Sequence, residues 1–371
     1  MTSNPLVLHV VGARPNMMKI APIMKAMSEL GRCSQLLVHT GQHYDFEMSE
    51  VFIQDLRMPY PDIRLEVGSA SHAVQTAQIM IAFEQVLIHH QPTLVCVVGD
   101  VNSTLACTLV AAKLHIPVAH VEAGLRSNNR RMPEEINRIV TDSISDILFT
   151  TERQSAENLT REGISVSKIH FVGNVMVDSL LSHRELSRKS KVLERFRLRS
   201  GHYGLVTLHR PDNVDNRDRF MDWINKLGRL SYDLPILFPV HPRTQKRIDE
   251  GNLNTVLASY PGISLSRPLG YLDFLHAMAN AQLVMTDSGG IQEETTALGI
   301  PCLTLREETE RPITVLEGTN VVIGNDPSRL LAEAYQILCG NGKTGRIPEL
   351  WDGHAATRIA QILDRFVGSI H

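Results

Sequence analysis

The sequence predicts an α/β protein of two domains, each built on a parallel β-sheet that helices cover on both faces. Two observations lead to this prediction. The chain has 371 residues, which is more than one hydrophobic core usually supports. Short, continuous apolar runs also alternate with helical stretches along most of the chain, and this pattern is typical of parallel sheets whose strands are buried on both sides.

The alternation begins at the N-terminus. A buried strand is expected over Leu6–Val11 and a helix over Asn16–Leu30. Five further segments of the first half continue the pattern, as strand, helix, strand, helix and strand: Ser34–His39, Ala73–Gln91, Leu94–Val98, Ser103–Lys113 and Val118–Val121. Because a helix separates most neighbouring strands, we expect the strands to pair in parallel.

The pattern pauses over Val175–Gly201, where polar and basic helix-forming residues dominate, and then resumes. The strands of the second half are expected at Gly204–Leu208, Ile236–Val240, Ala281–Met285 and Cys302–Leu305. An amphipathic helix is expected over Ala355–Val367. The sequence thus predicts an N-terminal domain over residues 1–175, a C-terminal domain over 176–354, and a terminal segment, 355–371, that packs back on the first domain.

Composition and charge argue against several functional classes. A formal net charge of −3 gives the chain no general attraction to nucleic acid or to an anionic membrane, so any phosphate site must be local. The five cysteines are scattered along the chain and odd in number, which predicts reduced thiols in a cytoplasmic protein. We identify no membrane-spanning run and no signal-peptide pattern.

Ligands of open parallel sheets bind beyond the carboxyl ends of the strands, so the residues after each strand are the candidates for a site. After Ala281–Met285 comes Thr286-Asp287-Ser288-Gly289-Gly290, and a helix is expected over Ile291–Leu298. Such a junction offers backbone N–H groups to a phosphate, and Glu293 or Glu294 can accept hydrogen bonds from ribose hydroxyls. A tight turn with no ligand is the alternative interpretation.

Basic side chains follow other strands. Arg14 and Lys19 lie at the start of the first predicted helix, where cations are unfavourable unless an anion balances them, and they suit a diphosphate. His209 and His241 follow two strands of the second half and can transfer a proton or neutralise a leaving phosphate. A further cluster of charges, Arg306–Arg311, follows the last predicted strand.

Carboxylates follow consecutive strands of the first half. Asp100 and Glu122 each come directly after or at the end of a strand, and Glu134 and Glu135 lie where a helix begins. Acids gathered at one edge of a sheet raise one another's pKa, as general acid/base chemistry requires. Helix capping is the alternative for Asp100, Glu134 and Glu135. Glu122, between a buried strand and a glycine, has no such structural role.

Other chemistries find little support. Histidines, cysteines and acids lack the spacing of a zinc or non-haem iron site, so we expect no metal. Ser288 is not in the Gly-x-Ser-x-Gly context of hydrolase nucleophiles. No Gly-x-Gly-x-x-Gly follows the first strand, so we expect no bound dinucleotide cofactor.

The chain resembles the non-hydrolysing UDP-N-acetylglucosamine 2-epimerases over nearly its whole length. The matching segments, in the family's order, are GARPNMMKIAP (Gly12–Pro22), TGQH (Thr40–His43), VGDVNSTLA (Val98–Ala106), HVEAGLRS (His120–Ser127), PEEINR (Pro133–Arg138), VGNVMVD (Val172–Asp178), LHRPDNVD (Leu208–Asp215), PVHPRT (Pro239–Thr244), TDSGGIQEE (Thr286–Glu294) and ETERPITVLEGTN (Glu308–Asn320). The resemblance implies two Rossmann-like domains of the glycosyltransferase-B type, an active site in the cleft between them, and a homodimer.

The resemblance also implies a reaction and roles for residues. A base removes the C2 proton of UDP-N-acetylglucosamine, UDP leaves from C1, and UDP adds back to the 2-acetamidoglucal after reprotonation from the opposite face. Asp100, Glu122 and Glu134 are similar to the family's acid/base group, and His209 to the residue that assists the leaving diphosphate. The residues expected to bind the substrate are Arg14, Lys19, Arg138, His241, Ser288, Gly289, Gly290, Glu294 and Arg311.

The chain departs from the family pattern at the second site through which UDP-N-acetylglucosamine activates bacterial members. Gln42 is retained, Asp45 stands where a second glutamine is usual, and no arginine occurs between Glu66 and Glu84. We therefore expect the manno epimer to be converted without added UDP-N-acetylglucosamine.

Three alternatives stay open. A sister epimerase acts on UDP-2,3-diacetamido-2,3-dideoxyglucuronate and shares the Gly12-Ala13-Arg14-Pro15 variant, but spacing alone identifies no extra cation for its carboxylate. A hydrolysing 2-epimerase would release N-acetylmannosamine and UDP. A UDP-sugar glycosyltransferase or binding protein has the same fold class, although a binder gains nothing from clustered carboxylates.

Overall fold

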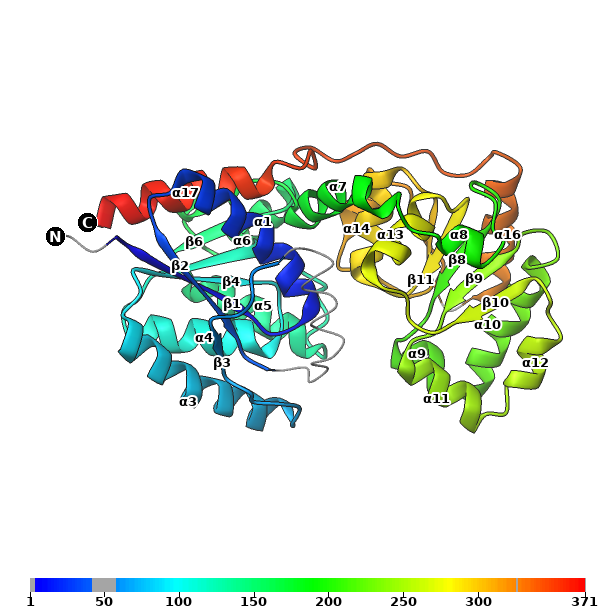
Figure 1. Cartoon of the computed structure of the whole chain (residues 1–371), viewed down its shortest axis with the longest axis horizontal. Helices are drawn as coiled ribbons and strands as arrows, with labels where there is room; N and C mark the ends of the chain where they lie inside the picture. The colour runs from blue at the N-terminus through cyan, green and yellow to red at the C-terminus, as the bar shows by residue number, and fades with distance from the viewer. Residues whose placement is uncertain (1–3, 42–57, 325, 371) are drawn as a thin grey trace. The chain divides into compact units, whose positions relative to one another are not determined.

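The computed structural model describes residues 4–41, 58–324 and 326–370 (Figure 1). The chain divides into two compact units. Unit 1 comprises Met1–Ser179 together with Glu349–His371, and unit 2 comprises Leu180–Pro348. The chain leaves unit 1 within a single helix, α7 (Val175–Ser187).

Unit 1 contains a parallel sheet of seven strands in the order β3-β2-β1-β4-β5-β6-β7. The strands are β1 (Leu6–Val11), β2 (Ser34–His39), β3 (Ile63–Arg64), β4 (Leu94–Val98), β5 (Val118–Ala123), β6 (Ile147–Thr150) and β7 (Ile169–Phe171). The order reverses between β1 and β4, which are neighbours at the centre of the sheet. The carboxyl ends of β1, β4 and β5 therefore lie side by side at the point where such sheets bind ligands.

Helices cover both faces of this sheet (Figure 1). Besides α7 they are α1 (Arg14–Leu30), α3 (His72–His90), α4 (Asn102–Lys113), α5 (Pro133–Ile144), α6 (Arg153–Arg161), the 3₁₀ helix η1 (Val166–Lys168) and α17 (Ala355–Ile370). The chain's last helix, α17, packs along α1. Its apolar positions Ile359, Leu363 and Val367 repeat every four residues and are all buried. Asp178 accepts hydrogen bonds from the first amides of α17, Ala355 N at 3.2 Å and Ala356 N at 2.7 Å.

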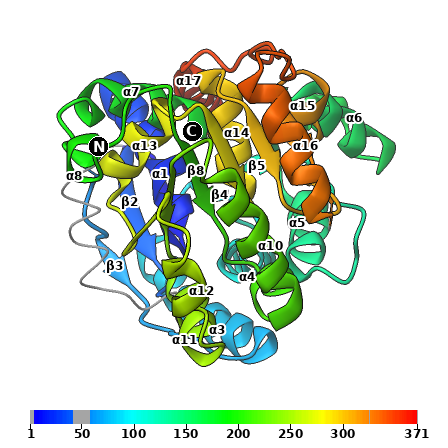
Figure 2. The same cartoon turned by 90° about the vertical axis from the view of Figure 1, so that its right-hand side faces the viewer.

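Unit 2 contains a parallel sheet of six strands in the order β10-β9-β8-β11-β12-β13. The strands are β8 (Gly204–Thr207), β9 (Ile236–Pro239), β10 (Ile263–Ser266), β11 (Leu283–Thr286), β12 (Cys302–Thr304) and β13 (Asn320–Val322). Its helices are α8 (Val192–Arg195), α9 (Pro211–Val214), α10 (Arg217–Leu230), α11 (Pro242–Glu250), α12 (Asn254–Ala258), α13 (Tyr271–Ala279), α14 (Gly289–Leu298), α15 (Pro312–Leu316) and α16 (Pro327–Leu338). Helices α10 and α16 pack against each other (Figure 2) and cover a core around Trp223 and Phe238.

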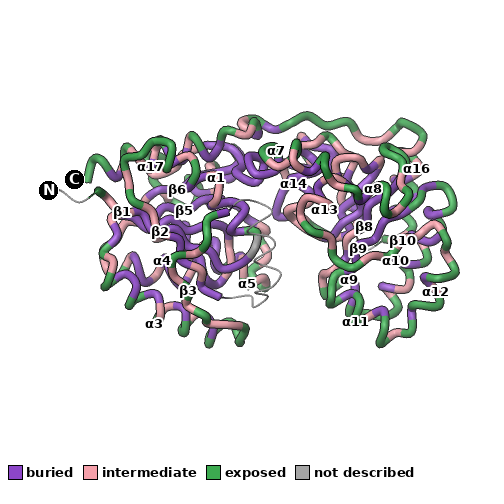
Figure 3. The backbone as a smooth tube through the Cα atoms, in the orientation of Figure 1, coloured by how far each residue is buried: buried purple, intermediate pink, exposed green. Residues whose placement is uncertain are grey.

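The prediction of an α/β protein with parallel sheets is confirmed. The central strands of both sheets are buried, whereas β3, β7 and β10 are partly exposed, and the helices present their exposed sides outward (Figure 3). Helix α14 begins at Gly289, two residues before the predicted start, because the glycines join the first turn instead of a preceding loop. The sequence also missed the short strands β3, β6, β7, β10 and β13.

Candidate active site

The backbone of Glu122 is unusual at the end of a central strand. Its φ angle is 73°, a left-handed conformation that costs a non-glycine residue roughly 1–2 kcal/mol. The pairing register between β5 and β6 also shifts between Val121 and Ala123, around this residue. A strained residue of this kind persists only where the surrounding structure holds it in place, and such residues are concentrated at functional sites.

Glu122 forms a buried ion pair with Lys19 from helix α1. Only 5% of Glu122 and 8% of Lys19 are exposed. Gly99, just after β4, comes close to both charges: a Cβ atom there would lie 3.6 Å from Glu122 Oε2 and 3.6 Å from Lys19 Nζ. The pair therefore lies at the shared end of β4 and β5, next to the turn that carries Asp100.

Asp100 is paired with a different cation. Arg138 of helix α5 donates from Nη1 to Asp100 Oδ2 at 2.6 Å, and the Asp100 side chain is 31% exposed. The sequence argument expected the acids to repel one another. The structure corrects this expectation, because Asp100 and Glu122 each lie beside a cation, and general acid/base chemistry here would operate on ion-paired carboxylates.

The two acids at the start of α5 have different environments. Glu135 is buried and accepts hydrogen bonds from Ser127 N at 3.0 Å, Asn128 N at 2.9 Å and Arg138 Nη2 at 2.6 Å. Burial opposes its ionisation, but these donors outweigh it and lower the pKa of Glu135. Glu134 lies half-buried in the first turn of the same helix. Glu135 thus fixes the loop and Arg138, and Glu134 is the acid left for chemistry.

Asn16 is a site residue that sequence reasoning did not single out. Its Oδ1 accepts from Gly12 N at 3.2 Å and Ala13 N at 3.0 Å, and its Nδ2 donates to Val98 O at 3.1 Å. Asn16 therefore joins the turn after β1 to the end of β4.

In unit 2 a buried aspartate organises the corresponding strand ends. Asp287, just after β11, is fully buried. It accepts from the backbone amides of His209 and Arg210, both at 2.9 Å, and lies 2.8 Å from His209 Nδ1. Burial opposes its ionisation, but these partners lower the pKa of Asp287. The contact with Nδ1 leaves His209 Nε2 for a ligand.

His241 lies beside His209, with 5.5 Å between the ring centroids. Its Nδ1 accepts from Arg243 N at 3.2 Å at the start of α11. Burial and the neighbouring His209 lower the pKa of His241, so the neutral ring is favoured. The two histidines predicted after separate strands are therefore brought together.

The start of α14 has the features of an anion site. Ser288 is the N-cap residue, but its side chain makes no capping hydrogen bond. A Cβ atom at Gly289 would lie 2.6 Å from Glu310 Oε1, so any other residue there would displace the Glu310 carboxylate. Glu310 in turn contacts Arg306 at 2.8 Å and Arg210 at 3.7 Å. Burial opposes its ionisation, but the surrounding arginines lower the pKa of Glu310 to about 2.

The neighbouring acids of α14 have different partners. Glu293 Oε1 forms an ion pair with Arg311, 3.0 Å from its Nε, and both side chains are buried. Glu294 faces the Tyr271 hydroxyl instead. Burial and the charge of Glu293 raise the pKa of Glu294 to about 8. Of the two carboxylates that the sequence left open for ribose, Glu294 is the one not committed to an arginine.

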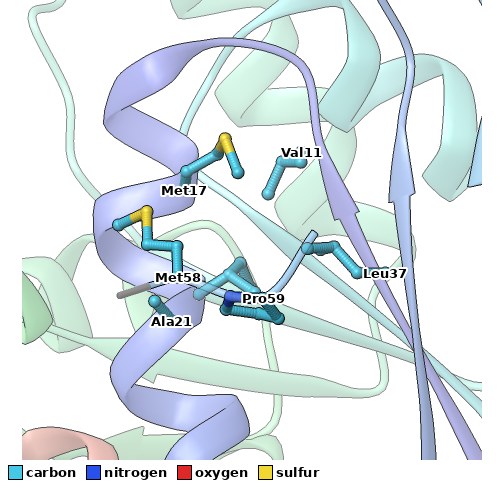
Figure 4. A pocket seen from close by; sticks show the side chains of 7 residues that line it. Val11, Met17, Ala21, Leu37, Met58 and Pro59 are labelled. Atoms are coloured by element: carbon cyan, nitrogen blue, oxygen red, sulfur yellow. The ribbon is translucent and has the colours of Figure 1, made fainter. Parts of the chain in front are cut away.

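Some expected positions lie outside the described part of the structure: the Arg14 side chain, Gln42 and Asp45. Within the described residues, no cluster of histidine, cysteine and acidic side chains could hold a metal ion, and no helix could cross a membrane. A small hollow in unit 1 (Figure 4) is lined by apolar residues alone, namely Val11, Met17, Ile20, Ala21, Leu37, Met58 and Pro59. Such a lining does not suit a nucleotide sugar, which needs polar contacts.

Comparisons with known proteins agree with this geometry. The family model described as UDP-N-acetylglucosamine 2-epimerase matches residues 25–364. The UDP-N-acetylglucosamine 2-epimerase of Methanocaldococcus jannaschii is 42% identical over 359 residues, which are 95% of this chain and 97% of that protein. The UDP-2,3-diacetamido-2,3-dideoxy-D-glucuronate 2-epimerase of Pseudomonas aeruginosa is 38% identical over 364 residues, 96% of this chain and 99% of that one.

Solved structures give the same result. The M. jannaschii enzyme in complex with UDP-GlcNAc and UDP superposes with a TM-score of 0.88 at 42% identity, covering 97% of this chain and 99% of that one. The Neisseria meningitidis UDP-GlcNAc 2-epimerase bound to UDP-GlcNAc has a TM-score of 0.87 at 28% identity, covering 97% and 100%. The chain therefore belongs to the UDP-N-acetylglucosamine 2-epimerase family of isomerases.

Proposed function

We propose that the chain interconverts UDP-N-acetylglucosamine and UDP-N-acetylmannosamine by inverting C2, without releasing free sugar. The observation that carries the proposal is the pair of carboxylates Glu122 and Asp100 at adjacent strand ends, each beside a cation, in a chain 42% identical to a protein of that name. Two acids at one strand edge suit removal of a proton from one face of C2 and its return to the other.

The reaction proceeds by elimination and re-addition. Glu122 or Asp100 takes the C2 proton while the C1–O bond to UDP breaks, and the electrons of the C2–H bond form the C1=C2 double bond. UDP then adds back to C1 as the other acid delivers a proton to the opposite face of C2. Lys19 and Arg138 stabilise the carboxylates between these steps, and Glu134 is a third group within the set.

Unit 2 carries most of the residues expected to bind UDP. The backbone amides of Gly289 and Gly290 face the diphosphate at the start of α14, where the helix dipole favours an anion. His209, held through Nδ1 by Asp287, offers Nε2 to the leaving diphosphate, with His241 beside it. Glu294 accepts hydrogen bonds from the ribose hydroxyls, and Arg14 and Arg311 complete the expected binding set.

Proton NMR in deuterium oxide tests this proposal. UDP-N-acetylglucosamine should gain deuterium at C2 and develop the manno anomeric signal. Glu122→Gln and Asp100→Asn should each lose C2 exchange while the Kd for UDP stays within about tenfold, because these acids contribute to proton transfer and not to UDP binding. Asp364→Asn, which breaks only a surface pair with Arg32 in the same unit, is the control and should exchange normally. Free UDP with reducing sugar would point to the hydrolysing reaction.

A second candidate substrate is UDP-2,3-diacetamido-2,3-dideoxyglucuronate, the substrate in the name of a relative 38% identical to this chain. The structure adds a supporting observation: Arg130 and Arg131 are exposed in the loop between β5 and α5, four and three residues before Glu134 in the sequence. Either guanidinium could bind the uronate carboxylate. C2 deuteration of this sugar but not of UDP-N-acetylglucosamine, lost in Arg130→Ala or Arg131→Ala, would favour the second substrate.

We also propose a homodimer that forms through helix α3. Val74, Ile81 and Ile88 are exposed and recur every seven residues, so they form one apolar stripe on this helix. Ile81→Asp should turn a dimer into a monomer in light scattering coupled to gel filtration. Val166→Asp is the matched control, since Val166 and Ile81 are both 69% exposed and Val166 lies on a different element. An unchanged mass for Ile81→Asp contradicts the proposed interface.

We further propose a cytoplasmic location. All five cysteines are free thiols in the structure, and burial raises the pKa of Cys96 to about 12 and that of Cys302 to about 11. Buried, protonated thiols suit a reducing compartment. Fractionation of the native host cells, with the protein in the soluble cytoplasmic fraction, is the expected result.

A further inference from the structure

His120 is fully buried in strand β5 and contacts two acceptors. Its Nε2 lies 2.9 Å from Gly99 O, and its Nδ1 lies 2.6 Å from Asp142 Oδ1 of helix α5. No step of the reaction described above uses either side chain. Neither residue stands out in the sequence, because His120 is one polar residue in an apolar strand and Asp142 is one polar residue in a helix.

The hydrogen bonds determine the protonation state of this ring. Gly99 O can only accept, so His120 Nε2 carries a proton. Asp142 Oδ2 accepts from Gly124 N at 3.0 Å and lies 2.8 Å from Arg126 Nη1, which is the environment of an ionised carboxylate. Burial opposes this charge, but His120 and Arg126 outweigh it and lower the pKa of Asp142. An anionic oxygen 2.6 Å from Nδ1 requires a second ring proton, so His120 is an imidazolium.

The same bonds fix the backbone on both sides of the acid/base residues. Asp142 binds His120 and the amide of Gly124, which lie two residues before and two residues after Glu122. His120 binds the carbonyl of Gly99, the residue directly before Asp100. Gly99 N also donates to Val121 O at 3.1 Å. The left-handed backbone of Glu122 is thus held by hydrogen bonds on both sides. The His120 ring also connects the turn of Asp100 to that of Glu122.

We propose that His120 and Asp142 are positioning residues, whose imidazolium–carboxylate pair holds the turns of Asp100 and Glu122 at the separation that proton transfer at C2 needs. This inference rests on the proposed roles of those two acids. Neither His120 nor Asp142 touches the substrate. Loss of the pair should lower kcat with little change in UDP affinity, because the residues expected to hold UDP lie mainly in unit 2.

Two substitutions separate the two halves of the pair. His120→Asn keeps a donor near the Nδ1 position, toward Asp142, and loses the bond to Gly99 O. His120→Gln keeps a donor near the Nε2 position and loses Asp142. The control is His9→Asn in strand β1, which β4 separates from β5 in the same sheet: His9 is also fully buried, and its Nε2 contacts Gln35 Oε1 at 3.0 Å. All three should fold with lowered Tm.

The measurements are kcat and KM for UDP-N-acetylglucosamine by NMR, the Kd for UDP by calorimetry, and Tm. We expect kcat to fall about 10²-fold in His120→Asn and His120→Gln, as a shift of about 1 Å in a reacting group produces, and to stay near wild type in His9→Asn. Selective ¹⁵N labelling of histidine should show both His120 nitrogens protonated at neutral pH, and Asp142→Asn should abolish that signature.

Either of two results overturns the proposal. The first is that kcat falls no more in the His120 variants than in His9→Asn when their losses of Tm are equal. The second is a neutral His120 ring in the wild-type protein. Failure of the proposed function looks different. In that case the wild-type protein itself gives no C2 exchange, or Glu122→Gln and Asp100→Asn retain it.

Discussion

The turn after Glu122 depends on a glycine that no other residue can replace. Gly124 has a φ angle of +79°, and a Cβ atom there would lie 2.3 Å from Ser155 O and 3.0 Å from Leu159 Cγ. Ser155 O belongs to the backbone of helix α6, so the clash cannot be relieved by rotating a side chain. Gly124→Ala should therefore move either the turn or the helix.

Gly163 provides a matched control. It has a φ angle of +88° in the same unit, but nothing lies within 4 Å of the position of its Cβ atom. Both alanine variants incur the cost of a left-handed non-glycine residue, about 1 kcal/mol at the lower end of the range given above for Glu122. Only Gly124→Ala adds the cost of overpacking, about 1–3 kcal/mol. The expected free energies of destabilisation are therefore about 2–4 kcal/mol for Gly124→Ala and about 1 kcal/mol for Gly163→Ala.

Thermal unfolding followed by circular dichroism measures the difference. For a unit of this size, 1 kcal/mol shifts Tm by about 2–4 °C. Gly124→Ala should thus lose about 4–16 °C and Gly163→Ala about 2–4 °C. Gly124→Ala should also lose C2 exchange, because the turn it distorts carries Glu122. Equal Tm losses in the two variants would refute the steric reasoning.

Three further predictions concern unit 2. Burial and the charge of Glu293 raise the folded-state pKa of Glu294 to about 8, so the stability of the wild-type protein falls as pH rises from the ordinary glutamate pKa through about 8. The Tm of Glu294→Gln should therefore exceed that of the wild type by a margin that grows over this pH range. A margin that stays constant with pH contradicts this prediction. Asp287→Asn should lower kcat about 10²-fold by releasing His209, measured by NMR progress curves, and an unchanged kcat opposes that role. Gly289→Ala should raise the Kd for UDP, measured by calorimetry, about tenfold. Gly290→Ala should raise it less, because the added methyl meets no atom within 4 Å. Equal effects of the two substitutions on the Kd would be inconsistent with a clash at Gly289.

The strands at the centre of each sheet could be predicted from sequence because both of their faces are buried. Leu6–Val11 is apolar except for His9, and its bounds match β1. The two-residue strand β3 and the three-residue strands β7 and β13 include partly exposed residues. Such segments carry no hydrophobic run, and only pairing with a neighbour that lies far away in sequence makes them strands.

The candidate site was predictable in its positions but not in its pairings. The rule that ligands lie beyond strand ends identified Asp100, Glu122 and His209. It did not show that Lys19 would contact Glu122 across 103 residues of sequence, since the choice of partner depends on which strands become neighbours. Asp142 was missed for the same reason: its partners come from β5 and the turn after it, and within its own helix nothing distinguishes it from a solvent-facing acid.

Unit 1 cannot be completed until the ribosome has made almost the whole chain, because its last helix, α17, is encoded after all of unit 2. Until then the apolar face that Ile359, Leu363 and Val367 will cover stays open in the nascent protein. Unit 2 is continuous over residues 180–348 and meets no such delay. The first unit, although its synthesis begins first, therefore waits for the last residues of the chain, and its open apolar face is a part that needs protection from aggregation during translation.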